Sequence, residues 1–143
     1  MGGPTYDVAD TILAFQKVGI PAGKIILGVP FYGHLWPTAG PAINARTTGP
    51  GWDVLYRDGI TLDATYGASY DPVEGVMWGE YQARTCPACP LTWWQFYVDN
   101  ATTLRRKWDY INDHGLLGTG LWAVGYEGDH PEPWIQLRAA FLK

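Results

Sequence analysis

The stretch Gly118-Thr-Gly-Leu-Trp-Ala-Val-Gly-Tyr-Glu-Gly128 decides the fold that we predict for this chain. Its apolar residues are interspersed with glycines, which let a neighbouring backbone or a ligand approach closely, so we interpret it as one buried strand. Trp122, Tyr126 and Glu127 lie at its carboxyl end, and Asp129 follows shortly after. A flat aromatic ring beside acidic groups at the end of a strand is typical of a sugar-binding floor. The alternative is that Trp122 belongs to the core and Glu127 to a solvated loop.

Length, charge and hydropathy exclude several classes of protein. A chain of 143 residues is one ordinary domain with enough residues for a core. The formal net charge of −4 gives no basic face, so we expect neither nucleic acid nor a membrane surface as a partner. No apolar run approaches the roughly 20 residues that a membrane-spanning helix needs. The residues from Met1 to Tyr6 lack the charged and apolar regions of a signal peptide, so we expect no signal peptide in this chain.

A helix followed by a buried strand is predicted near the N-terminus. Asp7 is a good N-cap, apolar residues then recur at helical spacing, and Pro21 forbids continuation, so we predict a helix over about 7–18. The run Lys24-Ile-Ile-Leu-Gly-Val-Pro-Phe-Tyr32 is almost continuously apolar. Such a run is typical of a strand that is buried on both faces in a parallel sheet covered by helices.

The section from about 34 to 97 has a different character, because Gly, Pro, Thr and aromatic residues dominate it and helical periodicity is lost. Arg57-Asp58-Gly59-Ile60 predicts a hairpin turn between two short strands. Thr92 to Val98 is rich in aromatic and β-branched residues and predicts another strand, on which Trp93 and Trp94 face opposite sides. We interpret the whole section as a small β-rich insertion.

Two further helices are predicted in the last third of the chain. Asp99 or Asn100 caps the first, which ends at Gly115. The second begins near Pro131 and Pro133 and continues to the C-terminus. Apolar residues at helical spacing mark the buried sides of both helices: Ala101, Leu104, Trp108 and Ile111 in the first, and Trp134, Leu137 and Phe141 in the second.

The pair Cys86-Pro-Ala-Cys89 has the spacing of a redox motif, but the thioredoxin-like pattern around such motifs is missing. A zinc site would need two more ligands, and the three His residues are scattered. We therefore expect a local disulfide in an exported protein, with free thiols as the alternative. We expect no metal and no other cofactor.

Four stretches resemble, in order, the C-terminal third of glycoside hydrolase family 18, the chitinase family. They are the run Lys24 to Gly33, Trp94 to Asp99, Thr103-Leu-Arg-Arg-Lys107, and Gly115-Leu-Leu-Gly-Thr-Gly-Leu-Trp-Ala-Val-Gly-Tyr126. The resemblance implies a (β/α)8 barrel in which residues 24–32 form the seventh strand and 118–126 the eighth. It also implies that the insertion walls the substrate cleft. The fold class that we predict is therefore α/β, a partial (β/α)8 TIM barrel consisting of its last strands and helices, with a small β-rich insertion at about 34–97.

The resemblance also suggests substrate-binding residues. Trp122 matches the tryptophan that forms the floor of the subsite where the glycosidic bond is cut. Tyr32 ends the seventh strand, on the face where such barrels place their active sites. With Trp36 and Tyr126, these residues are our candidate platforms for chitin or a related N-acetylglucosamine glycan.

The catalytic signature of the family, Asp-x-x-Asp-x-Asp-x-Glu with the final Glu as general acid, does not occur in this sequence. The family uses the N-acetyl group of the substrate as nucleophile, but it still needs the acid. Glu127 and Asp129 are the carboxylates that directly follow a predicted barrel strand, so they are our candidate catalytic residues, Glu127 first because it is nearer Trp122. The alternative is an exposed loop role.

Two functions remain open at this point. In the first, the chain supplies cleft residues to a hydrolase that acts on β-1,4-linked N-acetylglucosamine polymers. In the second, it binds chitin or another glycan without catalysis. Because six barrel strands are missing, we expect the remaining two to self-associate through their exposed edges. We expect secretion of the full-length form.

Overall fold

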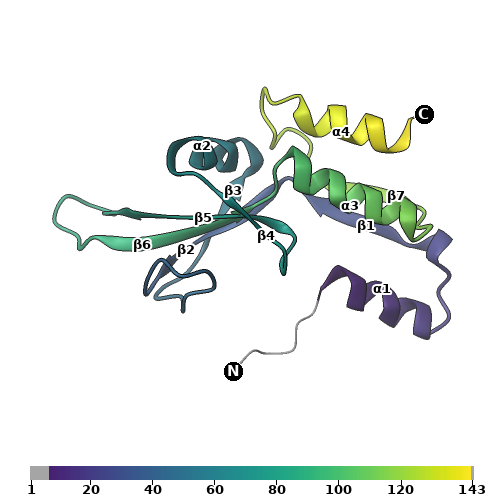
Figure 1. The fold of residues 1–143 in the computed structure, drawn as a ribbon, viewed down its shortest axis with the longest axis horizontal. Helices are drawn as coiled ribbons and strands as arrows, with labels where there is room; N and C mark the ends of the chain where they lie inside the picture. The colour runs from purple at the N-terminus through teal and green to yellow at the C-terminus, as the bar shows by residue number, and fades with distance from the viewer. Residues whose placement is uncertain (1–6, 143) are drawn as a thin grey trace.

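The computed structural model describes residues 7–142 and divides into two regions that share one chain (Figure 1). One region, which we call the helical region, contains two parallel strands, three α-helices and the short 3-10 helix η1 (Ala22–Lys24). The other, which we call the sheet region, contains five antiparallel strands and one helix. The helical region consists of α1 (Val8–Lys17), β1 (Ile26–Pro30), α3 (Ala101–Asp113), β7 (Gly118–Trp122) and α4 (Glu132–Phe141). The sheet region consists of β2 (Tyr32–Thr38), β3 (Trp52–Leu55), α2 (Tyr56–Tyr66), β4 (Ser69–Asp71), β5 (Val76–Ala83) and β6 (Thr92–Val98).

The helix caps of the helical region confirm two sequence predictions. The Asp7 side chain accepts a hydrogen bond from the Asp10 backbone N–H at 2.8 Å and so begins α1. Asn100 caps α3 by accepting from the backbone N–H groups of Thr102 and Thr103, and the Thr103 hydroxyl accepts in return from the Asn100 N–H. Both helices therefore begin where the local sequence predicts.

The main core lies where α3 packs against β1 and β7 on one side and against α4 on the other. Leu104, Trp108 and Ile111, which recur at helical spacing on α3, are at most 1% exposed. Strands β1 and β7 pair in parallel, with Val29 opposite Leu121 and Pro30 opposite Trp122. The sequence prediction of two adjacent parallel strands is confirmed.

The prediction that the first strand is buried on both faces is wrong, and so is the prediction that the second is a buried strand. Ile26 of β1 is 59% exposed and Trp122 of β7 is 69% exposed. Side chains alternate along a strand, so Val29 enters the core beneath the helices while Ile26 and Trp122 lie on the opposite face. In the part of the chain that the structure describes, helices cover only the first of these faces. Strand β7 also ends at Trp122, before the predicted boundary.

The five strands of the sheet region lie in the order β3-β2-β6-β5-β4, all antiparallel. Helix α2 covers one face, where Val54, Phe96 and Val98 form a small second core. Strand β6 confirms the prediction for residues 92–98, and of its two neighbouring tryptophans Trp94 is buried while Trp93 is half-buried.

The predicted hairpin turn at residues 57–60 is wrong, because these residues form the first turns of α2. Two contacts outside the segment favour the helix. Tyr56, the first residue of α2, is 2% exposed and belongs to the main core. Gly59 lies so close to β6 that an added Cβ would meet the Val98 side chain at 2.9 Å. Packing therefore overrides the local turn signal.

A disulfide joins Cys86 and Cys89 in the connection between β5 and β6, as predicted from their spacing. No helix among residues 7–142 is long and apolar enough to cross a membrane. Within the same residues, no three His, Cys, Asp or Glu side chains gather as a metal site would require. The prediction about a signal peptide falls on Met1 to Tyr6, outside the described residues.

Candidate functional site

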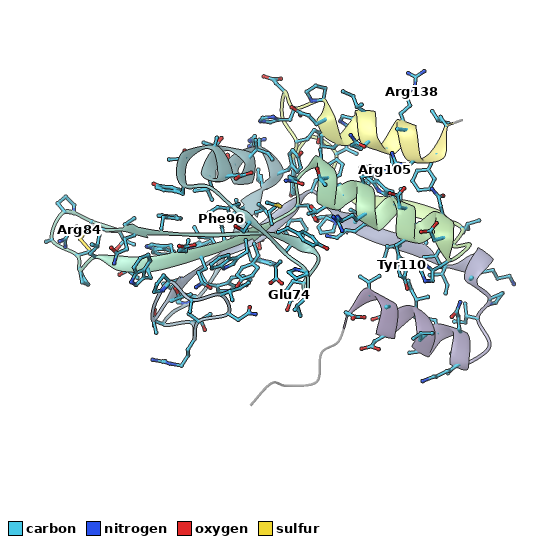
Figure 2. All side chains as sticks on the ribbon, viewed as in Figure 1. Glu74, Arg84, Phe96, Arg105, Tyr110 and Arg138 are labelled. Carbon is cyan, nitrogen blue, oxygen red and sulfur yellow. A yellow bond between two sulfur atoms is a disulfide. The ribbon has the colours of Figure 1, made fainter. Side chains whose placement is uncertain are left out.

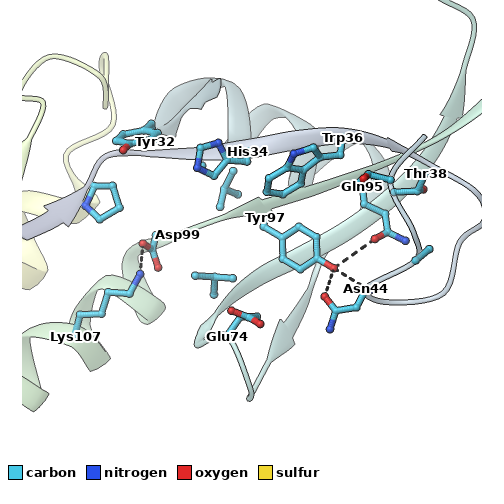
Figure 3. A pocket seen from close by; sticks show the side chains of 16 residues that line it. Tyr32, His34, Trp36, Thr38, Asn44, Glu74, Gln95, Tyr97, Asp99 and Lys107 are labelled. Carbon is cyan, nitrogen blue, oxygen red and sulfur yellow. Dashed lines mark hydrogen bonds and ion pairs between the residues drawn. The ribbon is translucent and has the colours of Figure 1, made fainter. Parts of the chain in front are cut away.

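A cavity of about 490 Å³ opens on the face of the sheet that α2 does not cover (Figure 3). It extends from the end of β1 along β2 and β6, and the loop over residues 39–47 forms part of its wall. Its labelled lining residues are Tyr32, His34, Trp36, Thr38, Asn44, Glu74, Gln95, Tyr97, Asp99 and Lys107.

A row of aromatic rings follows β2 along this cavity. Tyr32, His34 and Trp36 alternate with residues of the opposite face and therefore point to the same side of the sheet. Their ring centroids are separated by 5.7 Å and 5.1 Å, and Trp36 lies 5.8 Å from the ring of Tyr97 on β6. Such a row provides consecutive apolar platforms with polar edges, which suits the faces of linked sugar rings.

Hydrogen bonds fix the loop at the far end of the row. The Gln95 amide donates to the carbonyl oxygens of Gly40 and Ala42 at 3.2 and 2.6 Å. The Tyr97 hydroxyl accepts from the Asn44 backbone N–H and donates to the Asn44 side chain, both at 3.0 Å (Figure 3). Burial raises the pKa of Tyr97 above its usual value, so the hydroxyl keeps its proton to a higher pH than a solvated tyrosine does.

An ion pair lies at the other end of the cavity (Figure 3). Asp99 is 4% exposed and pairs with the Lys107 ammonium, while the Thr103 hydroxyl donates to its second oxygen at 2.8 Å. A buried carboxylate that is paired and hydrogen-bonded in this way holds the start of α3 against β6. Glu74 is the other carboxylate in the lining.

A second, open cavity of about 390 Å³ lies over the exposed face of the strand pair. Trp122 and Gly120 of β7 line it together with Gly28 and Pro30 of β1 and with Tyr32. Pro30 and Tyr32 line both cavities, so the two are continuous in their lining. The structure therefore brings Trp122 and Tyr32 to one surface, and Trp36 continues that surface along β2.

The remaining predicted site residues lie elsewhere. Neither of the two cavities is lined by Tyr126, Glu127 or Asp129. Tyr126 is half-buried against the main core, and Asp129 is exposed in the loop before α4. Glu127 is 7% exposed and accepts hydrogen bonds from the Gly125 N–H and from the indole N–H of Trp134. A catalytic role for Glu127 or Asp129 stays a prediction.

Sequence reasoning missed several residues of the first cavity. The sequence could have identified His34, because this residue lies midway between the predicted platforms Tyr32 and Trp36 on one side of a strand. Gln95 and Tyr97 have a similar signal, since they alternate with Trp94 along the predicted strand. Asn44 has none, because its place depends on a loop that folds back from a distant strand.

The chain is similar to known proteins of one family in both its sequence and its fold. The model of the family Glycosyl hydrolases family 18 matches residues 1–127. Chitinase C of Streptomyces lividans is 30% identical over 130 residues, which are 90% of this chain and 20% of that protein. A chitinase structure from Chromobacterium violaceum has a TM-score of 0.73 and 26% identity, covering 99% of this chain and 41% of its own. A class V chitinase from Nicotiana tobaccum, solved in complex with NAG4, has a TM-score of 0.77 and 20% identity, covering 98% and 41%.

The chain spans only 19 to 28% of the length of the curated relatives that it matches. The structural matches confirm the predicted fold class, because they cover nearly all of this chain with part of a chitinase barrel. The family match covers most of the sequence and agrees with the motifs on β1, β6, α3 and β7. This chain therefore belongs to glycosyl hydrolase family 18.

Proposed function

We propose that this chain forms one wall and part of the floor of a chitinase cleft, in a protein that hydrolyses β-1,4-linked N-acetylglucosamine polymers. In this proposal residues 1–143 are the C-terminal portion of a chitinase-like (β/α)8 domain, and the section from about 34 to 97 is its insertion. Secretion of the full-length protein also belongs to the proposal, and the Cys86–Cys89 disulfide fits an oxidising compartment.

The exposure of Trp122 is the observation that supports the proposal most directly. Its indole is 69% exposed beside an open cavity, at the carboxyl end of a parallel strand. The carboxyl ends of barrel strands are where enzymes of this architecture place their active sites. Contact between the apolar faces of an exposed indole and water is unfavourable, and the apolar face of a sugar ring would cover the indole. Tyr32 borders the same cavity and leads to Trp36.

Glycan binding without catalysis is the second candidate. The family's acid signature does not occur in this sequence, and Asp99, one of the two carboxylates in the larger cavity, is paired with Lys107. In this reading the aromatic row and Trp122 bind the glycan, and no residue of this chain donates the proton.

Calorimetric titration with the tetrasaccharide of N-acetylglucosamine tests the shared part of both candidates. Trp122→Ala should weaken binding by about fivefold or more, since a stacked aromatic pair contributes about 1 kcal/mol beyond its buried area. Trp52→Ala, which removes a half-exposed tryptophan outside both cavity linings, is the matched control and should bind as the parent does. Equal affinity of the folded Trp122→Ala variant and the parent would remove Trp122 from the site.

Turnover of a chromogenic chitobioside separates the two candidates. Activity of this chain that is lost in Glu127→Gln, with binding retained, would support Glu127 as the general acid, whose contribution is typically about 100- to 10,000-fold. Asp129→Asn tests the second candidate acid in the same way. Binding without turnover in the parent would favour the non-catalytic function of this chain.

A further inference from the structure

Glu127 is a buried carboxylate whose two oxygens are both occupied by uncharged donors. The Gly125 backbone N–H donates to Oε2 at 2.7 Å, and the indole N–H of Trp134 donates to Oε1 at 3.0 Å. Among residues 7–142, no Lys, Arg or His forms an ion pair with it. The residue is 7% exposed, so these two hydrogen bonds replace the water that a carboxylate otherwise binds.

The first of these bonds closes the loop that follows Trp122. Within this loop the Tyr126 N–H donates to the Ala123 carbonyl at 3.1 Å, and the Gly128 N–H donates to the Gly125 carbonyl at 3.2 Å. Gly125 has a φ of 98°, a backbone conformation that only glycine adopts readily. In this conformation its N–H points at the Glu127 side chain. Glu127 thus fixes the chain three residues after the proposed sugar platform.

The second hydrogen bond connects Glu127, through Trp134 and Phe31, to the chain next to Tyr32. Trp134 on α4 packs edge-on against Phe31, with ring centroids 5.7 Å apart. Phe31 is fully buried and directly precedes Tyr32, and its backbone N–H donates to the Trp122 carbonyl at 2.7 Å. One connected set of contacts therefore joins Glu127 to the backbone on both sides of the surface that Trp122 and Tyr32 form.

We propose that Glu127 is a positioning residue that holds Trp122 and Tyr32 in the relative orientation that sugar stacking requires. It acts through Gly125 and Trp134, and it does not touch the glycan. The proposal rests on the proposed function, because it needs Trp122 to be a sugar platform. It differs from the catalytic prediction for Glu127, which requires the carboxyl group to reach the leaving oxygen of the substrate.

The chemistry of glutamine makes the proposal testable. A carboxylate accepts hydrogen bonds at both oxygens, whereas the side-chain amide of glutamine has one acceptor and one donor. Glu127→Gln would therefore turn an NH2 group towards either Gly125 or Trp134, and that contact would be lost. Trp134→Phe removes only the bond between the indole N–H and Glu127, and it retains a ring against Phe31.

We would measure binding of the N-acetylglucosamine tetrasaccharide to the 143-residue chain and its variants by calorimetry. Glu127→Gln should weaken binding about tenfold, equivalent to about 1.4 kcal/mol. Trp134→Phe should weaken it less, by about threefold. In the Trp122→Ala background, Glu127→Gln should change affinity by less than about twofold, because without Trp122 there is no pair of rings whose relative orientation Glu127 can set. Glu132→Gln, an exposed carboxylate in the first turn of α4, is the charge-matched control and should bind as the parent does.

The indole N–H resonances of Trp122 and Trp134 give a readout that needs no sugar. Both should move in Glu127→Gln while circular dichroism shows an intact fold. An unmoved Trp122 resonance would overturn the positioning role even if the chain binds no tetrasaccharide. Full affinity in Glu127→Gln alongside weakened binding in Trp122→Ala would also overturn it. If Trp122→Ala binds as the parent does, the proposed function fails instead.

Discussion

The sheet region and the helical region differ in how much of their apolar surface the chain covers. In the sheet region, α2 covers one face, where Phe96 is fully buried, and the other face presents polar and aromatic side chains to the cavity. In the helical region, Trp108 is fully buried between α3 and the strands, yet Ile26 and Trp122 are mostly exposed on the opposite face of the strands. Figure 2 draws the side chains of both regions, with Phe96 labelled in the sheet region and Tyr110 in the helical region.

This difference follows from how the two kinds of sheet are built. An antiparallel sheet can present one polar face to water, whereas parallel strands are normally covered on both faces. The sheet region therefore satisfies this rule, because α2 covers one face of its antiparallel sheet and the other face carries polar groups. The strand pair satisfies it on one face only, and its exposed face is the one on which Trp122 lies. The same incomplete coverage thus provides the proposed binding surface and an exposed apolar surface.

The largest expected effect comes from the main core. Trp108→Ala removes a fully buried indole from α3 and should lower the free energy of unfolding by about 3–5 kcal/mol. Because Tyr56 of α2 is buried in the same core, we expect both regions to unfold together. Urea denaturation followed by circular dichroism and by fluorescence should then give coincident curves. Two separate transitions would show that the sheet region is stable by itself. Trp52→Ala, at a half-exposed site, should cost less than about 1 kcal/mol.

A smaller effect is expected on self-association, which we propose for the exposed strands of the helical region. Sedimentation velocity should show dimers or larger species of this chain at micromolar concentration. Ile26→Lys places a charge on the exposed face of β1 and should weaken association about tenfold, as charged residues do on natural sheet edges. Leu91→Lys, at a 51% exposed position just before β6 in the sheet region, is the control and should leave association unchanged. A monomeric parent would contradict the prediction.

The smallest expected effect concerns pH and tests the link between the two regions. Burial, followed by the charges of Glu132 and Asp99, raises the pKa of Tyr56 far above its usual value. The folded state therefore keeps this proton after the unfolded chain has begun to lose it near pH 10. The stabilisation is complete below that pH and is lost as pH rises towards the folded pKa, by up to about 1.4 kcal/mol per pH unit.

Tyr56→Phe should make the free energy of unfolding fall less steeply with pH, by the slope that about one titrating proton contributes. The measurement is the free energy of unfolding between pH 8 and pH 11, taken from urea titrations at each pH. Tyr66→Phe, at a 49% exposed site at the end of the same helix, should leave the slope unchanged. An equal slope in the parent and in Tyr56→Phe would mean that Tyr56 titrates normally and is accessible to water.

Much of the fold could be predicted because the signals are local. The N-caps at Asp7 and Asn100 satisfy helix N–H groups within three residues of each cap, so their effect needs no tertiary contact. The Cys86–Cys89 disulfide is also a local feature, because its two cysteines have a sequence separation of 3. Part of the candidate site could be predicted as well, because Trp122 ends β7 and Tyr32 follows shortly after the end of β1, and the carboxyl ends of these two strands meet in a parallel pair. The predicted strand over 24–32 is nevertheless too long, since β1 ends at Pro30 and Tyr32 begins β2.

The sequence by itself therefore determined helices α1, α3 and α4, the parallel strand pair and the candidate sugar platforms Trp122, Tyr32 and Trp36. Only the tertiary structure decided that residues 57–60 are helical, because Gly59 and Tyr56 are held by distant partners. It also decided that Glu127 lies buried against Trp134, since that hydrogen bond depends on how α4 packs against α3. The physical reason is the same in both cases. Periodicity and capping act within a few residues, whereas burial and hydrogen-bond partners are set by segments that meet only when the whole chain packs.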